Sequence, residues 1–143
     1  MAESLSVESP AALLDSVGVS LGPTPPLELS ADSVREYRAA TGDPSAEPVP
    51  PFLLLSLVNH FLPQLVTVRS FSMGVNVGLG SVRFPGAASS GDVRLVATGE
   101  ILDAVEIRDA VQVVVKVRLL AEGENGNDDV IVCEADTISR FTP

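Results

Sequence analysis

The spacing of apolar residues changes near the middle of the chain, from helical spacing to strict alternation. In residues 30–42, Val34 and Tyr37 recur at the spacing of one helix face. Ser30 is a good N-cap residue at the start of this segment, and Gly42 supplies a stop at its end. The pattern predicts a helix between these two residues.

The next apolar segment, residues 52–66, reads FLLLSLVNHFLPQLV and is apolar on nearly every side of a helical projection. Such a pattern is typical of a helix that is buried all round. Two prolines precede the segment, which suits a helix entry because the first N–H groups have no helical partner. The segment is too short, and too interrupted by polar residues and a proline, to span a bilayer. It predicts a buried central helix.

After residue 66 the pattern alternates, as expected for strands with one buried face. Long strands are predicted in residues 69–84, 91–107, 110–123 and 128–141. The third strand is the clearest, because Val or Leu occupies every second position from 111 to 119, whereas Lys116 and Arg118 face the other way. Residues 122–129, EGENGNDD, have the composition of a hairpin turn before the last strand.

The N-terminal part has weaker signals. Residues 1–9 are expected to form a disordered tail, and the segment of residues 9–22 is expected to contain a short helix that ends near Gly18. The order is therefore a short helix, a second helix, a buried helix and a run of antiparallel strands. A long antiparallel sheet with one apolar face needs a cover, and the central helix is the natural one. We predict an α+β fold in a single domain, residues 1–143, with the sheet wrapped around a central buried helix.

Composition and charge exclude several classes of partner. The net charge is −10 and the pI is about 4.3, so the chain lacks the clustered cations that bind nucleic acid or an anionic membrane. Cys133 is the only cysteine, which excludes an internal disulfide and a cysteine-based metal site. No signal-peptide pattern opens the sequence, and we expect a cytoplasmic protein without a metal or other cofactor.

Two segments resemble the MaoC-like hot-dog family, which includes the (R)-specific enoyl-CoA hydratases and their nodulation-protein-N-like branch. The first is EYRAATGD, residues 36–43, and the second is VNVGLGSVRFPGAASSGDVRL, residues 75–95. The similarity covers roughly residues 28–141. The resemblance implies a hot-dog fold, a long antiparallel sheet around a central helix, which agrees with the predicted order of helices and strands.

The resemblance also implies a chemistry, the reversible addition of water to a 2,3-unsaturated acyl thioester. The family uses a carboxylate and an imidazole that together hold one water molecule. Asp43 matches the carboxylate, but Pro48 stands where the histidine is expected, and the loop before the central helix is shortened. Glu47 is a candidate replacement that would share a proton with Asp43. The only histidine, His60, lies within the central helix, where its role stays open.

The large side chains near the central helix are candidates for a substrate cavity. Tyr37, Phe52, Phe71 and Met73 are the candidate wall, although each also suits an ordinary core. Asn76 is polar within a predicted strand, where asparagine is unfavourable. Two interpretations stay open, a hydrogen bond to the backbone or to a substrate, and a bulge or edge position in the sheet.

Three functions follow from a retained cavity with altered catalytic residues. The first is a repurposed, cofactor-free enzyme that cyclises or isomerises an acyl, polyene or polyketide chain, free or linked to a carrier or CoA. The second is a hydratase or dehydratase that uses Asp43 with another partner. The third is a non-catalytic subunit of a hydratase heterodimer. For the first two we expect a homodimer or a higher homo-oligomer.

Overall fold

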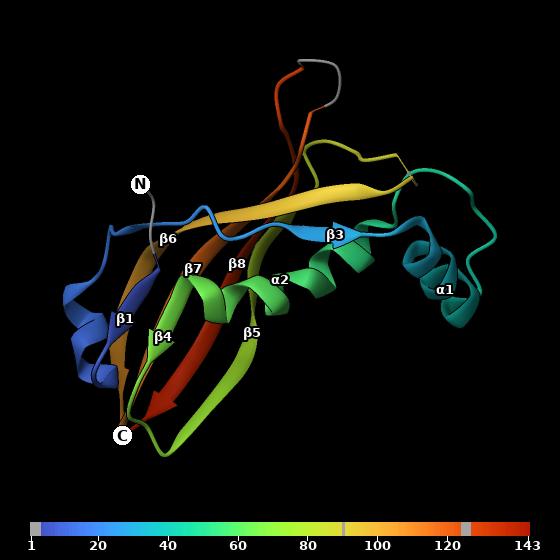
Figure 1. Ribbon diagram of the computed structural model, residues 1–143. Coiled ribbons are helices and arrows are strands. Elements are labelled where there is room, and N and C mark those ends of the chain that lie inside the picture. The colour runs from blue at the N-terminus through green and yellow to red at the C-terminus, as the bar shows by residue number, and fades with distance from the viewer. Residues whose placement is uncertain (1–3, 90, 124–126) are drawn as a thin grey trace.

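The computed structural model describes residues 4–89, 91–123 and 127–143 and contains one large antiparallel sheet (Figure 1). Its strand order is β2-β6-β7-β8-β5, with β3 paired to β6 beside β2. The strands are β2 (Ser20–Leu21), β3 (Leu27–Leu29), β5 (Met73–Arg83), β6 (Val93–Ile107), β7 (Ala110–Ala121) and β8 (Val130–Thr142). The predicted long strands are confirmed, and β7 alternates as expected, with Val or Leu buried at every second position from 111 to 119.

The central helix α2 (Pro51–Leu65) crosses the inner face of this sheet and packs against β6, β7 and β8. Its buried residues are Leu54, Val58, Phe61 and Leu65, a stripe at helical spacing along one face. Gly99 of β6 allows the close approach, because a Cβ atom there would lie 2.5 Å from the carbonyl oxygen of Lys116 and 3.4 Å from a methyl group of Leu65. The predicted sheet around a central helix is confirmed.

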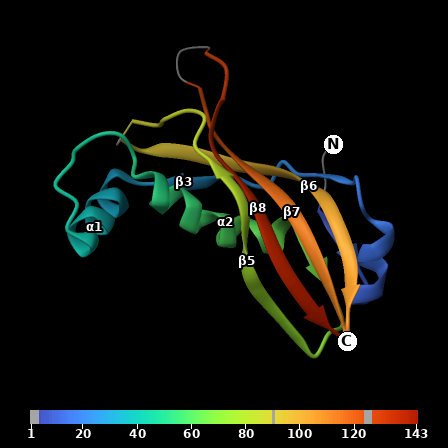
Figure 2. The same ribbon diagram turned by 180° about the vertical axis from the view of Figure 1, so that it is seen from behind.

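The expectation that this helix is buried all round is wrong. Phe52 is 70% exposed, and Asn59 and His60 are also exposed. Seen from behind, the strands lie in front of α2, so the sheet covers only one side of the helix (Figure 2). Within the described part of the chain no second layer packs on the other side. The apolar residues of α2 therefore exceed what the sheet of one chain can bury.

The helix predicted between Ser30 and Gly42 is confirmed as α1 (Ala31–Thr41). The Ser33 N–H donates to the Ser30 hydroxyl oxygen over 3.1 Å, and Gly42 ends the helix with a left-handed φ of 71°. Helix α1 stands apart from the sheet, beyond the N-terminal end of α2 (Figure 1). The end of the loop between the two helices meets the segment after β5, where the Val49 N–H donates to the Ala88 carbonyl oxygen over 2.9 Å.

The N-terminal segment is more ordered than expected. Strand β1 (Leu5–Val7) pairs in parallel with β4 (Val66–Val68), so the expected disordered tail is wrong for these residues, while residues 1–3 lie outside the described residues. Val7 is buried in this pairing, which explains why the segment is held. The expected short helix is a 3-10 helix, η1 (Pro10–Asp15), which ends before Gly18 and packs on β6 and β7.

A charged cluster joins β5 to β8 and β7 on the outer face of the sheet. Glu134 pairs with Arg83, and its other carboxylate oxygen accepts from Arg118 Nε over 3.0 Å. The Lys116 ammonium lies 3.6 Å from Glu134 and 3.5 Å from Asp136. The hydrogen bond from Arg83, then that from Arg118 and the charge of Lys116, lower the pKa of Glu134 to about 2 against the opposing effect of burial.

Candidate functional site

A largely apolar groove lies between the second half of α2 and the edge of the sheet formed by β5 and β8. Its volume is about 360 Å³, near the lower end of the roughly 300–1,000 Å³ typical of small-molecule sites. All three residues of β4 line it, together with Asn59, Leu62 and Pro63 of α2. The rest of the lining comes from Phe71 before β5, from Gly74, Val75 and Asn76 of β5, and from Ser139 and Phe141 of β8. None of these residues is charged.

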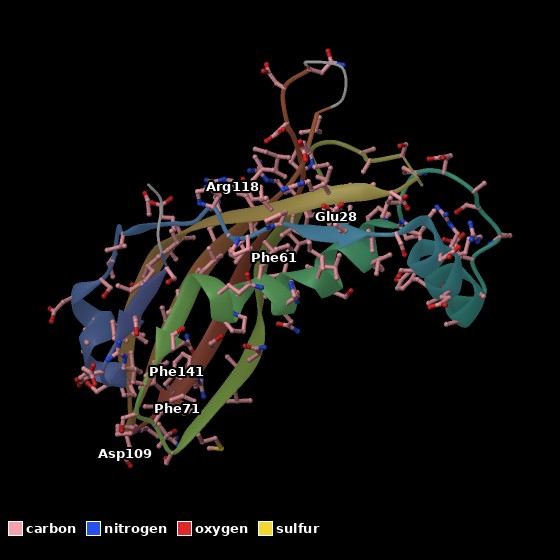
Figure 3. The ribbon with its side chains drawn as sticks, viewed as in Figure 1. Glu28, Phe61, Phe71, Asp109, Arg118 and Phe141 are labelled. Carbon is pink, nitrogen blue, oxygen red and sulfur yellow. The ribbon has the colours of Figure 1, made fainter. Side chains whose placement is uncertain are left out.

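Two aromatic rings form the apolar end of the groove. Phe71 and Phe141 lie together below α2, near the loop that joins β4 to β5 (Figure 3). Their ring centroids are 5.4 Å apart and the rings meet edge to face, a favourable aromatic arrangement. Phe71 remains 44% exposed, so one side of this pair is open to a ligand.

A chain of hydrogen bonds forms the polar wall of the same groove. The hydroxyl group of Ser139, which is 5% exposed, donates to Asn76 Oδ1 over 2.9 Å. Asn76 Nδ2 then donates to Asn59 Oδ1 over 3.1 Å. The register of β5 against β8 places Asn76 directly opposite Ser139. An irregularity follows Asn76, and the pairing resumes at Gly78. This series of hydrogen bonds therefore connects three separate elements, β8, β5 and α2.

Asp43 lies elsewhere, in the loop after α1. Its Oδ1 accepts from the Ser45 backbone N–H over 2.9 Å, the geometry of a local turn. This bond and a second one from the Ser45 side chain, helped by the charge of Arg38, hold the pKa of Asp43 below its usual range. Asp43 lines a separate hollow of about 620 Å³ with Arg35 and Arg38, which shares no lining residue with the groove.

The structure separates the residues proposed from the sequence. Phe71 and Asn76 line the groove. Phe52 is exposed at the start of α2, where its ring centroid lies 6.2 Å from that of Phe84. Met73 is 58% exposed at the start of β5.

The other candidates belong to the α1 end of the molecule. Tyr37 is half-buried on α1, and Glu47 is exposed in the following loop, near Asp43 in the chain. The structure therefore does not bring these residues to the groove that Phe71 and Asn76 line.

Sequence reasoning missed Asn59, Ser139 and Phe141 as parts of this groove. A signal for Ser139 existed, because the alternation of β8 assigns it to the same face as the buried Ala135 and Thr137. A polar residue on a buried face calls for a hydrogen-bond partner. No comparable pattern pointed to Asn59, because its partner lies 17 residues away in another element.

Other classes of site find little support. No group of three or more described histidine, cysteine, aspartate or glutamate side chains is arranged to hold a metal ion. Among the described residues, no helix is long and apolar enough to cross a membrane. Cys133 is fully buried, and this burial raises the pKa of its thiol to about 11, which leaves it unreactive at neutral pH. His60 is exposed, and its ring nitrogen Nε2 lies 3.2 Å from Gln64 Nε2.

Comparison with known proteins gives likeness of structure only. No protein-family model and no curated protein sequence matches the chain. A monoamine oxidase regulatory protein from Archaeoglobus fulgius is similar with a TM-score of 0.71 and 14% identity, over 98% of this chain and 97% of that chain.

Two further solved structures are similar over most of the chain. The (R)-hydratase from A. caviae, involved in PHA biosynthesis, has a TM-score of 0.56 and 17% identity, over 83% of this chain and 96% of that chain. A chain of the ChsH1-ChsH2 complex from Mycobacterium tuberculosis has a TM-score of 0.52 and 14% identity, over 89% of this chain and 98% of that chain. The chain therefore has the hot-dog fold of the MaoC-like hydratase family that its sequence resembles.

Proposed function

We propose that this protein binds an acyl or polyketide chain in the groove beside α2 and promotes its cofactor-free cyclisation or isomerisation. The observation that carries the proposal is the lining of the groove, which combines an apolar surface and no charged side chain with one hydrogen-bonded polar wall. Such a site suits a long neutral substrate that is apolar except at one functional group.

The groove favours catalysis by orientation. A flexible chain that is folded against Phe71 and Phe141 loses the conformational freedom that otherwise opposes ring closure. Holding two reacting carbons of one molecule at contact distance can remove a large part of a barrier, and the process needs no general base. Polarisation of a conjugated carbonyl by the polar wall would lower the barrier further.

Hydration through Asp43 is the alternative that this geometry favours less. A general base works best when its pKa lies near the working pH, whereas the hydrogen bonds from Ser45 lower the pKa of Asp43. A proton shared between Asp43 and Glu47 would instead raise the pKa of one of the two carboxyl groups. We therefore assign Asp43 a role in the turn after α1.

We further propose that the working form is a dimer of this chain, paired along β5. This strand forms one edge of the sheet, and Met73, Val75, Val77 and Leu79 on it are each more than 40% exposed. An exposed apolar edge strand is a ready template for pairing with another strand. The exposed side of α2 provides more apolar surface next to this edge, so a second copy would also deepen the groove.

The experiment offers the purified protein two thioester probes, a simple 2-enoyl thioester and a conjugated polyene thioester of similar length. We expect the polyene to give a product of unchanged mass and new NMR couplings, because cyclisation and isomerisation gain and lose no atoms. An Asp43→Asn variant should retain this activity. A product that gains the mass of one water from the 2-enoyl probe, and that disappears in Asp43→Asn, would establish the hydratase instead.

The oligomer is tested separately by light scattering on the purified chain. A dimer that a charged substitution on the edge strand, Val75→Lys, converts to a monomer supports pairing through β5. A wild-type monomer that becomes a dimer only with a different hot-dog chain would favour the role of a heterodimer subunit.

A further inference from the structure

We infer that the hydrogen-bonded chain Ser139–Asn76–Asn59 is a carbonyl-recognition site, in which Asn59 Nδ2 donates to the neutral carbonyl oxygen of a bound thioester or ketone. The inference rests on the proposed function, because it takes the groove as the binding site of an acyl chain. It adds the functional group that is recognised, the residue that recognises it and the direction in which the chain lies.

The direction of the hydrogen bonds makes Asn59 the donor. Ser139 has one hydroxyl proton, and Asn76 Oδ1 accepts it. Asn76 in turn donates a hydrogen bond from its Nδ2 to Asn59 Oδ1. The Oδ1 atom of Asn59 thereby accepts a hydrogen bond, and the Asn59 side chain, which lines the groove, still carries two N–H donors on Nδ2. Hydrogen bonds in such a series polarise one another, so the terminal donor is strengthened.

The position of these three hydrogen-bonded residues is hard to explain by their contribution to the stability of the fold alone. Ser139 is buried opposite Val113 of β7, on a face where the neighbouring positions are mostly apolar. Asn76 lies in a strand, where asparagine is unfavourable, and its pairing with Ser139 places it on the side of the sheet that faces the groove. A buried hydroxyl group such as that of Ser139 is costly unless it is paired, and a fold without a polar ligand would be served as well by an apolar residue at this position.

The absence of charge around the groove decides the class of ligand group. None of the described residues that line it is a lysine or an arginine, so a carboxylate or a phosphate would lose its hydration without an opposite charge. A neutral carbonyl needs only one or two N–H donors, which Asn59 supplies. The Phe71–Phe141 pair lies in the same groove and offers the apolar surface for the chain that follows. The bound molecule would thus place its carbonyl at Asn59 and its hydrocarbon part toward the two rings.

The test uses two probes that differ in one group. The first is the trans-2-decenoyl thioester of N-acetylcysteamine with carbon-13 at the carbonyl, and the second is its thioether analogue with CH2 in place of C=O. We expect the wild-type protein to bind the thioester about threefold to tenfold more tightly, the range of one net hydrogen bond. We also expect the carbonyl carbon signal to move downfield, as it does when the oxygen accepts a hydrogen bond.

The decisive variant is Asn59→Asp, which keeps the shape of the side chain and replaces its donor by an acceptor. It should abolish both the preference for the thioester and the downfield shift, and Asn59→Ala should do the same. Gln64→Ala is the matched control, because it removes a side-chain amide from the same helix outside the groove and should leave both readouts unchanged.

The outcomes separate this inference from the proposed function. If neither probe binds, the groove is not an acyl site and both proposals fall. If both probes bind equally well to the wild type, or if the Asn59 variants keep the preference, the groove stands and the carbonyl assignment is overturned. Loss of the preference in Gln64→Ala would also overturn it, because the effect would then belong to the helix in general.

Discussion

Two polar clusters join the edge strand β5 to β8, one on each face of the sheet, and they differ in how they end. On the outer face, Glu134 is surrounded by the cations of Arg83, Arg118 and Lys116. On the inner face, the chain that starts at Ser139 ends at an exposed amide in an apolar groove.

The difference teaches how to tell a structural cluster from a binding one. In the outer cluster opposite charges face each other, so the cluster is closed and its effect is to hold β5, β7 and β8 in register. In the inner cluster Ser139 donates to Asn76 and Asn76 donates to Asn59, so the amide of Asn59 keeps its own N–H groups for a ligand. We therefore expect substitutions in the outer cluster to reduce the free energy of unfolding, and substitutions at the open end of the inner chain to change binding.

The largest effect is expected from Glu134→Gln, which leaves three cations close together without their carboxylate. Breaking a buried ion pair costs several kcal/mol, and the exposure of Arg83 lowers this cost here. We expect a loss of about 2–3 kcal/mol in the free energy of unfolding, measured by urea titration. Glu122→Gln is the control, because its pair with Arg94 is exposed and should contribute less than about 0.5 kcal/mol. Equal losses in the two variants would refute the distinction between the two pairs.

The same cluster predicts a dependence of stability on pH. The pKa of Glu134 is about 2 in the folded protein, against an ordinary value near 4.5 in the unfolded chain. A folded-state pKa below the unfolded one stabilises the protein above the unfolded value, and this contribution is lost as pH falls from about 4.5 toward 2. Urea midpoints measured across this range should fall more steeply for the wild type than for Glu134→Gln. Parallel curves would show that Glu134 is not the titrating group.

A smaller effect is expected from Ser139→Ala, at the buried start of the inner chain. The variant removes the donor to Asn76 Oδ1 and should cost about 1–2 kcal/mol of unfolding free energy. It should also weaken the preference for a carbonyl ligand without abolishing it, because Asn59 keeps its N–H groups. Ser56→Ala, an exposed change on α2, serves as the control for the loss of a hydroxyl. A Ser139 variant that is as stable as this control would show that the inner chain contributes nothing to the fold.

The smallest effect on stability is expected from Asn59→Ala, at the open end of the chain. Asn59 is exposed, and alanine is the better helix former, so the unfolding free energy should change by less than about 0.5 kcal/mol. The same variant should lose the discrimination between the decenoyl thioester and its thioether analogue. If stability fell by as much as in Ser139→Ala, Asn59 would belong to the structural part of the cluster, and the comparison between a closed and an open cluster would fail.

Local patterns carried the prediction of the elements. Ser30 and Gly42 bound α1 because capping depends on the backbone of the neighbouring turn. The alternation in β7 was readable because successive side chains of a strand point to opposite faces. The short pairing of Leu5–Val7 with β4 was not predicted, because its partner lies some sixty residues further along the chain.

The candidate site was predicted only in part. Asn76 and Phe71 were proposed from residue type and position, and both line the groove. Asn59 was read as an interruption of an apolar helix, because nothing in the local sequence shows that it faces Asn76. The role expected for Asp43 came from the family motif, whereas its surroundings in the structure show a hydrogen-bonded turn.

The sequence by itself determined where the two α-helices and the four long strands lie and which face of the clearest strand is apolar, because these properties depend on spacing within one segment. The tertiary structure alone decided which side of α2 remains uncovered and which polar groups meet across the groove. These properties depend on contacts between segments that are distant in the chain, and a pattern within one segment contains no information about its partner.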